Sequence, residues 1–402
     1  MGSYSDLLRT SGVARIIAAQ LTARFPSGML SLAFLLHIER QTGSYGAAGL
    51  VLAATSLGQA IAGPLTSRFM GRWGMRPVLI TTLVICAVSV VAIALLPLTV
   101  PLYMAIGFIA GLSTPPVQPA VRTIYPKMVN SRQLTPLFSL DASAQEIIWV
   151  VGPVVTTFVS TQVGTVWGIL LAAVLMIGGG IWFISSPELG RVRIPRSKRR
   201  LGVVLTRPPV LLATVVGFLL IGAAAAIEAG VVAAFGHGGA EAGIVLAIFS
   251  VGSLAGGLFL GHVPIGPWST ARRMLIVFVG TGLAAFSMEF WWLSAMLFIA
   301  GIGIAPVLAV LFAIVSASVK FSDTAEAYGW VGTGQLIGAA LGSALAGFLI
   351  DGYGAQGAFW AATALALLGF LVSALGRRWH PDPRGRDASP IPDTEPVPMQ
   401  PS

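Results

Sequence analysis

The sequence predicts an all-α integral membrane protein with twelve transmembrane helices arranged as two six-helix repeats. Apolar residues make up 55% of the 402 residues, and long apolar stretches recur along the chain. Only 10% of the residues are charged, whereas soluble proteins average about a quarter. Because so few charges cannot cover a water-soluble fold, the composition excludes a cytosolic enzyme, a secreted disulfide scaffold and a disordered chain.

The twelve helices are predicted from stretches that are long enough to cross a bilayer. A hydrocarbon core of about 30 Å needs about 20 apolar residues at the rise of an α-helix. The expected spans are residues 12–38, 46–67, 77–97, 101–124, 136–160, 164–185, 208–234, 241–262, 272–290, 292–319, 327–350 and 356–376. Prolines within the fourth and tenth spans, Pro115, Pro116 and Pro306, predict kinks.

The basic residues predict the orientation of the chain, because lysine and arginine are retained in short cytoplasmic loops. With the N-terminus inside, 22 of the 24 lysines and arginines are assigned to the cytoplasmic side, among them Arg122 and Arg273. Arg40 lies outside and Arg24 within the membrane. We therefore expect a multi-pass protein of the bacterial plasma membrane with both termini cytoplasmic. The net charge of +9 then reflects orientation, so no nucleic acid partner is expected; the basic run 191–200 contacts lipid headgroups or is a solvated linker.

The chain divides into two related halves and a tail. Residues 48–63 match residues 242–257 at an offset of 194, and 108–111 match 298–301 at an offset of 190. The expected organisation is an N-terminal half over 1–186, a basic cytoplasmic linker over 187–207 and a C-terminal half over 208–376. Residues 377–402 are rich in proline and are predicted to form a disordered cytoplasmic tail.

Two parallel six-helix repeats joined by a basic loop are typical of secondary transporters. Over residues 10–378 the chain resembles the major facilitator superfamily. Three segments, Ala23–Met29, Thr42–Gly46 and Ser139–Glu146, are similar to actinobacterial efflux-type permeases. The resemblance implies the fold of that superfamily, alternating access around a central cavity, and export of a small organic molecule or drug in exchange for protons.

The loop between spans two and three, Ser67–Arg76, resembles the signature loop of the superfamily. Ser67 replaces its first glycine and Gly71 replaces its aspartate, while Arg72, Gly74 and Arg76 remain. The resemblance implies a cytoplasmic gate made of Arg68, Arg72, Gly74 and Arg76. We expect Arg72 and Arg76 to meet the end of span eleven, and Asp323 and Glu326 before that span to meet the basic loops. The arginine that drug–proton antiporters carry in span four is absent at Gly107, and only Gly152–Pro153 remains of their motif in span five.

Four ionisable residues are predicted to lie within the spans, where each is costly and needs a reason. They are Arg24, Asp141, Glu146 and Glu228. Arg24 and Glu146 lie at similar depths, so we expect an ion pair or shared polar network, which is either functional or a structural link between spans one and five. Asp141 lines the cavity or meets Arg132 at the membrane boundary. Because three acids face one base, at least two carboxylates are expected to lack a cation; these four residues are the candidates for proton coupling.

Several uncharged polar side chains are candidates for lining the substrate cavity. They are Gln20, Gln59, Gln118, Gln145, Trp149 and Gln335. Gln20 lies one turn before Arg24 on the same helix face. For the glutamines, hydrogen bonding between helices is the alternative role.

The sequence therefore predicts a secondary transporter and no enzyme. It contains no phosphate-binding loop with Gly-Lys-Ser or Gly-Lys-Thr and no paired metal-ligand histidines, so no cofactor or metal is expected. The expected partners are a small-molecule substrate, protons and membrane lipid, with a functional monomer. An uncoupled facilitator or a sugar or metabolite exporter is the alternative, and a non-transporting membrane receptor or scaffold is the alternative of another class.

Overall fold

The structure, a computed structural model, describes residues 4–197, 200–235, 240–261, 263, 265–380 and 389–393. Within these residues eleven helical segments are long and apolar enough to cross a membrane. The chain is an all-α multi-pass membrane protein, as its composition predicts. Helices suit the apolar stretches because they satisfy the backbone hydrogen bonds within each segment.

The first half runs from α1 to α10. Its elements are α1 (Tyr4–Arg9), α2 (Val13–Arg24), η1 (Phe25–Gly28), α3 (Leu30–Thr42), α4 (Tyr45–Trp73), α5 (Met75–Leu95), α6 (Val100–Leu112), α7 (Val117–Ile124), η2 (Tyr125–Lys127), α8 (Ser131–Gln162), α9 (Thr165–Ser185) and α10 (Pro187–Arg191). Glycines with positive φ end two of these helices, Gly43 after α3 at φ 68 and Gly74 after α4 at φ 93. A side chain would strain both positions.

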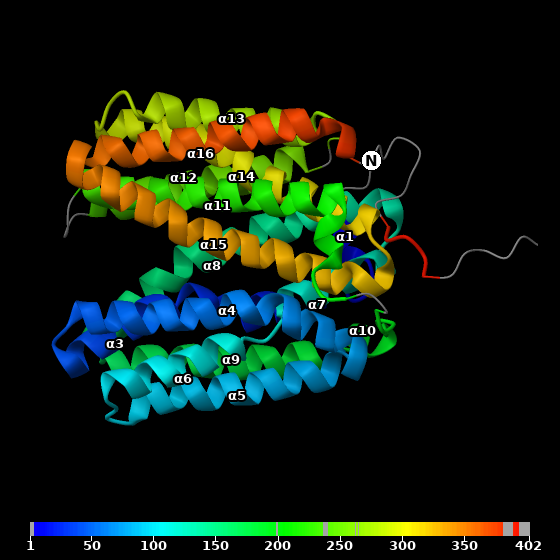
Figure 1. The fold of residues 1–402 in the computed structure, drawn as a ribbon, viewed down its shortest axis with the longest axis horizontal. Helices are drawn as coiled ribbons and strands as arrows, with labels where there is room; N and C mark the ends of the chain where they lie inside the picture. The colour runs from blue at the N-terminus through cyan, green and yellow to red at the C-terminus, as the bar shows by residue number, and fades with distance from the viewer. Residues whose placement is uncertain are drawn as a thin grey trace, which may run out of the picture.

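The second half follows the linker. Its elements are η3 (Val203–Thr206), α11 (Pro208–Phe235), α12 (Ala240–Leu260), α13 (Ser269–Ala284), α14 (Phe290–Ser318), α15 (Phe321–Tyr353), α16 (Ala355–Leu375) and η4 (Gly376–Trp379). Figure 1 shows α3–α6 and α9 gathered in one group and α11–α14 and α16 in the other, with α8 and α15 running diagonally between the groups. These two crossing helices therefore bring the halves together.

The two halves repeat one packing arrangement. On α4, a Cβ added to Gly58 would collide with the carbonyl oxygen of Phe108 on α6; on α12, a Cβ on Gly252 would collide with that of Phe298 on α14. The glycines and the phenylalanines are separated by 194 and 190 residues, the offsets that relate the two half-sequences. The internal match in sequence thus corresponds to equivalent contacts.

Two expected spans are interrupted rather than continuous. The first is divided by η1, where Pro26 follows Arg24, into α2 and α3. The fourth is divided into α6 and α7 at residues 113–116, because Pro115 and Pro116 cannot donate the backbone hydrogen bonds of a continuing helix. Pro306, by contrast, lies inside the continuous helix α14. Both breaks lie next to buried arginines.

Two further expectations differ from the structure. The expected ninth span, 272–290, is α13 with only 16 residues, which is about 24 Å of helix. The expected disordered tail is structured in part: residues 376–379 form η4 and Ile391 pairs with Lys320. Ile391 hydrogen-bonds the carbonyl of Val319 and the N–H of Phe321, two backbone groups at the turn before α15. Residues 381–388 and 394–402 lie outside the described residues.

Candidate functional site

A buried polar cluster lies inside the first half, where the two interrupted spans meet α8. Arg24 ends α2, Arg122 lies on α7, and Asp141 and Gln145 lie one turn apart on α8. The side chain of Asp141 is fully buried, and those of Arg122 and Arg24 are 3% and 10% exposed. A charged group this deep requires partners.

Asp141 is the acceptor at the centre of this cluster. Its Oδ2 accepts from Nε of Arg122 at 2.9 Å, and its Oδ1 accepts from Nη1 of Arg24 at 3.4 Å. Nε2 of Gln20 and the hydroxyl of Tyr125 also donate to Oδ1, at 3.0 and 3.2 Å. Four donors, two of them on guanidinium groups, therefore converge on this carboxylate.

The glutamines complete the cluster around the two guanidinium groups. Oε1 of Gln20 accepts from Arg24 at 2.7 Å, and Oε1 of Gln145 accepts from both Arg24 and Arg122. With its amide oxygen turned toward Arg122, Gln118 accepts from that guanidinium as well. Gln20, Gln118 and Gln145 are thus brought together as the sequence suggests, and here they bind arginines of the protein.

The structure changes three sequence-based assignments of charged residues. Arg24 pairs with Asp141, not Glu146, because Glu146 lies on a different face of α8. Asp141 meets Arg122, whereas the side chain of Arg132 lies outside the described part of the structure. Arg122 and Arg273, which were counted among the basic residues of the cytoplasmic side, are buried, with 2% and 6% of their surface exposed. Both fall within the predicted spans 101–124 and 272–290, and their position inside a span was the signal that could have identified them.

Glu146 and Glu228 are the other two acids predicted within the spans, and they belong to different halves. Ser253 on α12 and Glu228 on α11 are both near enough to Glu146 on α8 to influence its charge. Glu146 is half-buried and Glu228 is exposed. Neither forms an ion pair among the residues that the structure describes. The expectation that at least two embedded carboxylates lack a cation therefore agrees with the structure.

The remaining candidates for lining a cavity are not brought together. Trp149, one turn beyond Glu146 on α8, is 50% exposed. Gln335 on α15 packs toward Gly217 on α11, inside the second half, and its Nε2 has no hydrogen-bond partner. Gln59 is half-buried on α4. Of these three, only Trp149 presents a largely exposed side chain near the acid pair.

Backbone contacts close the halves together toward one end of the bundle. This end carries α1, α10 and the turn between α14 and α15, and is called the basic end below (Figure 1). Gly63 on α4 meets Gly329 on α15 so closely that a Cβ would lie 3.0 Å from its carbonyl oxygen. Gly257 on α12 takes the equivalent place against α8, where its carbonyl oxygen accepts from Ser139 at 2.6 Å.

An aromatic cluster fills the space beside the polar cluster. Phe138 of the first half contacts Phe312 and Tyr328 of the second, with ring centroids 6.4 Å apart in both pairs. The guanidinium of Arg122 lies 3.4 Å from the centroid of the Phe312 ring, a cation–π contact. Arg122 thus joins the polar cluster of one half to the aromatic face of the other.

The predicted gate residues have different partners from those expected. Arg68 forms the contact across the halves, with Glu326 at 3.0 Å, and Glu326 also accepts from the backbone N–H of Gly202 at 2.8 Å. Arg76 donates to the carbonyl of Ser186, and Arg72 lies over the ring of Trp73. The expectation that Arg72 and Arg76 meet the end of span eleven is therefore wrong, because both point along their own half. Gly74 forms the turn between α4 and α5.

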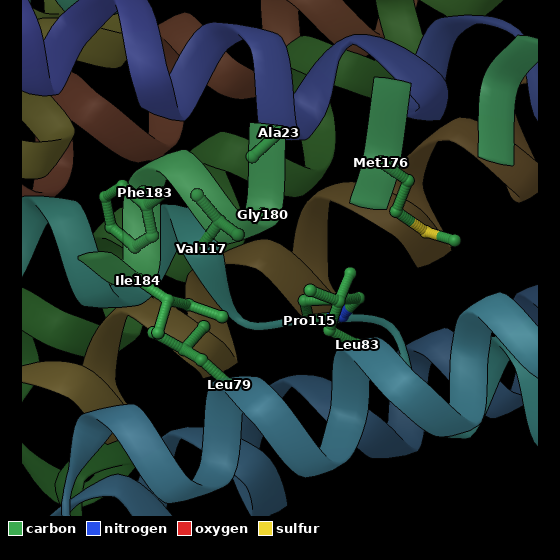
Figure 2. Close-up of a pocket in the computed structure, with 9 residues that line it drawn as sticks. All are labelled: Ala23, Leu79, Leu83, Pro115, Val117, Met176, Gly180, Phe183 and Ile184. Carbon is green, nitrogen blue, oxygen red and sulfur yellow. The ribbon is translucent and has the colours of Figure 1, made fainter. Parts of the chain in front are cut away.

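Figure 2 shows a separate pocket that is apolar throughout. Its lining comes from α2, α5, α7, α9 and the turn at Pro115, and consists of Ala23, Leu79, Leu83, Pro115, Val117, Met176, Gly180, Phe183 and Ile184. Apart from the weakly accepting sulfur of Met176, these side chains offer no hydrogen-bond donor or acceptor. The pocket is therefore distinct from the polar cluster and from the two acids.

Comparisons with known proteins agree with this architecture. The family model described as Major Facilitator Superfamily matches residues 16–288 and 222–401. No curated protein matches the sequence.

Several solved structures share the fold at low sequence identity. The human organic anion transporter MFSD10 (TETRAN) is 16% identical with a TM-score of 0.70, over 90% of this chain and 98% of that one. A bacterial homologue of the iron transporter ferroportin, in an outward-facing state, is 12% identical with a TM-score of 0.73, over 91% and 98%. The proton:xylose symporter XylE, bound to 6-bromo-6-deoxy-D-glucose, is 12% identical with a TM-score of 0.70, over 94% and 98%.

Proposed function

The chain belongs to the major facilitator superfamily of membrane transporters, and we propose that it exports a small organic molecule in exchange for protons. The observation that carries this proposal is the acid pair between the halves. Glu146 and Glu228 come from opposite halves, lie close enough for their charges to interact, and have no ion-pair partner among the described residues. Carboxyl groups placed in this way can take up and release protons as their surroundings change.

The contacts between the halves suggest how access to this pair would alternate. The Gly63, Gly257, Arg68 and Phe138 contacts all lie between the middle of the bundle and the basic end. At the level of the acid pair, Glu228 and Trp149 are exposed. We infer that this conformation faces outward, and that rocking of the halves exposes the pair to the other side.

Asp141, Arg24 and Arg122 would support this cycle as a fixed ionic cluster. Because Asp141 is held by two arginines, we assign the proton exchange to Glu146 and Glu228 and a positioning role to the cluster. Arg122 reaches Phe312 in the second half, so its contacts change when the halves move. Opening of the basic end would therefore break the contact between Arg122 and Phe312 while Arg122 stays bound to Asp141.

The proposal also includes the orientation of the protein in the membrane. The basic end would face the cytoplasm of a bacterial cell, in keeping with the retention of positive charge on that side. The chain would act as a monomer in contact with membrane lipid. We propose that it belongs with the actinobacterial efflux-type permeases, which would make it an exporter.

Proton exchange can be tested in everted vesicles that carry the protein. A respiration-driven pH gradient is recorded with the dye 9-amino-6-chloro-2-methoxyacridine, and compounds that raise the Tm of the purified protein are then added. We expect these compounds to restore dye fluorescence by driving proton release. Glu146→Gln and Glu228→Gln should each abolish the response, whereas Glu241→Gln, at the exposed start of α12, should retain it.

The outcomes separate this proposal from its alternatives. Full responses by both glutamine variants would rule out Glu146 and Glu228 as proton carriers. Flux of the same compounds in proteoliposomes that is unaffected by an uncoupler would identify a facilitator. A protein that binds a partner but moves none of the compounds would be a receptor or scaffold.

A further inference from the structure

A short segment of the C-terminal region lies against the turn between α14 and α15. The tail segment, defined as residues 389–393, follows the second half in the chain and runs beside the start of α15 at the basic end (Figure 1). The backbone N–H of Ile391 donates to the carbonyl of Val319 at 3.0 Å, and that of Phe321 donates to the carbonyl of Ile391 at 3.1 Å. Two backbone hydrogen bonds thus pair the segment with the turn.

Asp393 supplies the cap that α15 lacks in its own sequence. Lys320, at the N-cap position of α15, makes no side-chain hydrogen bond to the helix. Oδ1 of Asp393 accepts instead from the backbone N–H of Ser322 at 3.3 Å and from its hydroxyl at 2.7 Å. A carboxylate here satisfies an orphan N–H and interacts favourably with the helix dipole.

The part of α15 that the tail segment holds also contacts the first half. Nζ of Lys127, at the end of η2, lies 4.8 Å from the centroid of the Phe321 ring. Glu326, little more than one turn further along α15, pairs with Arg68. The residue whose backbone pairs with Ile391 therefore contributes directly to closure between the halves.

We propose that Ile391 and Asp393 are positioning residues for closure of the basic end. When the tail segment is seated, it fixes the first turn of α15 where Phe321 and Glu326 reach Lys127 and Arg68. When it is released, that turn frays and the basic end opens more readily. The proposal rests on the alternation inferred above, but its test requires no transported compound.

The test measures how often the basic end opens in the purified full-length protein. Ser67 on α4 is 1% exposed and faces Gly329 of α15, so a cysteine there reacts with a maleimide only when the halves separate. The background is Cys86→Ser, since Cys86 is the one native cysteine. Asp393→Ala removes the cap and Ile391→Pro removes the N–H that binds Val319. We expect Asp393→Ala to raise the labelling rate about fivefold, the usual effect of losing a helix cap, and Ile391→Pro to raise it by about the same factor through the loss of one hydrogen bond.

Two controls make the outcome decisive. Pro392→Ala changes the neighbouring exposed residue and should label at the parent rate, while Arg68→Gln, which removes the pair with Glu326, should label faster. If Arg68→Gln labels faster but Asp393→Ala and Ile391→Pro do not, the tail segment has no part in closure and the proposed transport cycle stands. An equal rise in Pro392→Ala would also overturn the assignment. If Arg68→Gln is unchanged together with the two tail variants, both the positioning role and the alternation at this end fail.

Discussion

Asp141 shows how one residue can stabilise several charges within a membrane protein. Its single negative charge offsets one of the two buried arginines, and it hydrogen-bonds both. Gln20 and Tyr125 also donate to Asp141, and Gln145 accepts from Arg24. Removing one partner of a buried ion pair leaves an uncompensated charge, which costs far more than the pair itself contributes. A substitution that removes the charge of Asp141 is therefore expected to be costly to stability.

Replacing Asp141 with asparagine should strongly destabilise the protein. We expect Asp141→Asn to lower the free energy of unfolding by about 3–5 kcal/mol, because Arg24 and Arg122 lose their charged partner. The measurement is unfolding in a titration with SDS. Adding Arg24→Gln should recover part of the loss, since it removes an unpaired cation. Asp351→Asn, at an exposed position, is the control. An equal loss of stability in that variant would contradict a particular role for Asp141.

At the level of helices, the closure between the halves depends on glycines whose backbones touch. Gly63 on α4 and Gly257 on α12 occupy corresponding places in the two repeats and contact α15 and α8. Their partners Thr333 and Ser139 each donate a hydroxyl across the contact, to the carbonyls of Ala60 at 2.8 Å and Gly257 at 2.6 Å. Small residues allow this close approach in a membrane, where apolar burial gives little attraction between helices.

A large side chain at Gly63 should therefore hold the basic end open. Overpacking typically costs about 1–3 kcal/mol, so Gly63→Leu should make the closed state at least about fivefold less populated. Ser139→Cys in the Cys86→Ser background reports on the other contact, between α8 and α12, and its labelling by maleimide should accelerate. Gly347→Leu, where a Cβ meets open space on α15, should have no effect. Unchanged labelling in Gly63→Leu would mean that the two contacts do not open together.

At the scale of the whole molecule, the two halves differ in the charged and aromatic side chains that they contain. The first half contains the ionic cluster of Arg24, Arg122 and Asp141, and the second contributes Glu228 and the aromatic rings that cover Arg122. Among the described residues, Glu146 on the crossing helix α8 is near enough to the acid of the second half to be influenced by its charge. Movement of the halves would therefore alter the acid pair and leave the hydrogen bonds at Asp141 intact.

The proposed orientation of the whole molecule can be checked by labelling intact cells. Arg193→Cys lies in the exposed linker at the basic end, and Thr99→Cys lies in the exposed turn between α5 and α6. In the Cys86→Ser background, a membrane-impermeant maleimide should label Thr99→Cys in intact cells and Arg193→Cys only after permeabilisation. The reverse pattern would invert the topology and, with it, the proposed direction of transport.

The sequence by itself determined the membrane fold, because span length, scarce charge and internal repetition are local properties of the chain. It also identified Asp141, Glu146 and Glu228 as costly acids that require an explanation. Only the tertiary structure decided which groups they meet. Arg24 and Arg122 both pair with Asp141 in the interior of the first half, and Asp393 caps a helix that begins 72 residues earlier. These partners are far apart in the chain, and the proline breaks and crossing helices that bring them together set distances that no local pattern encodes.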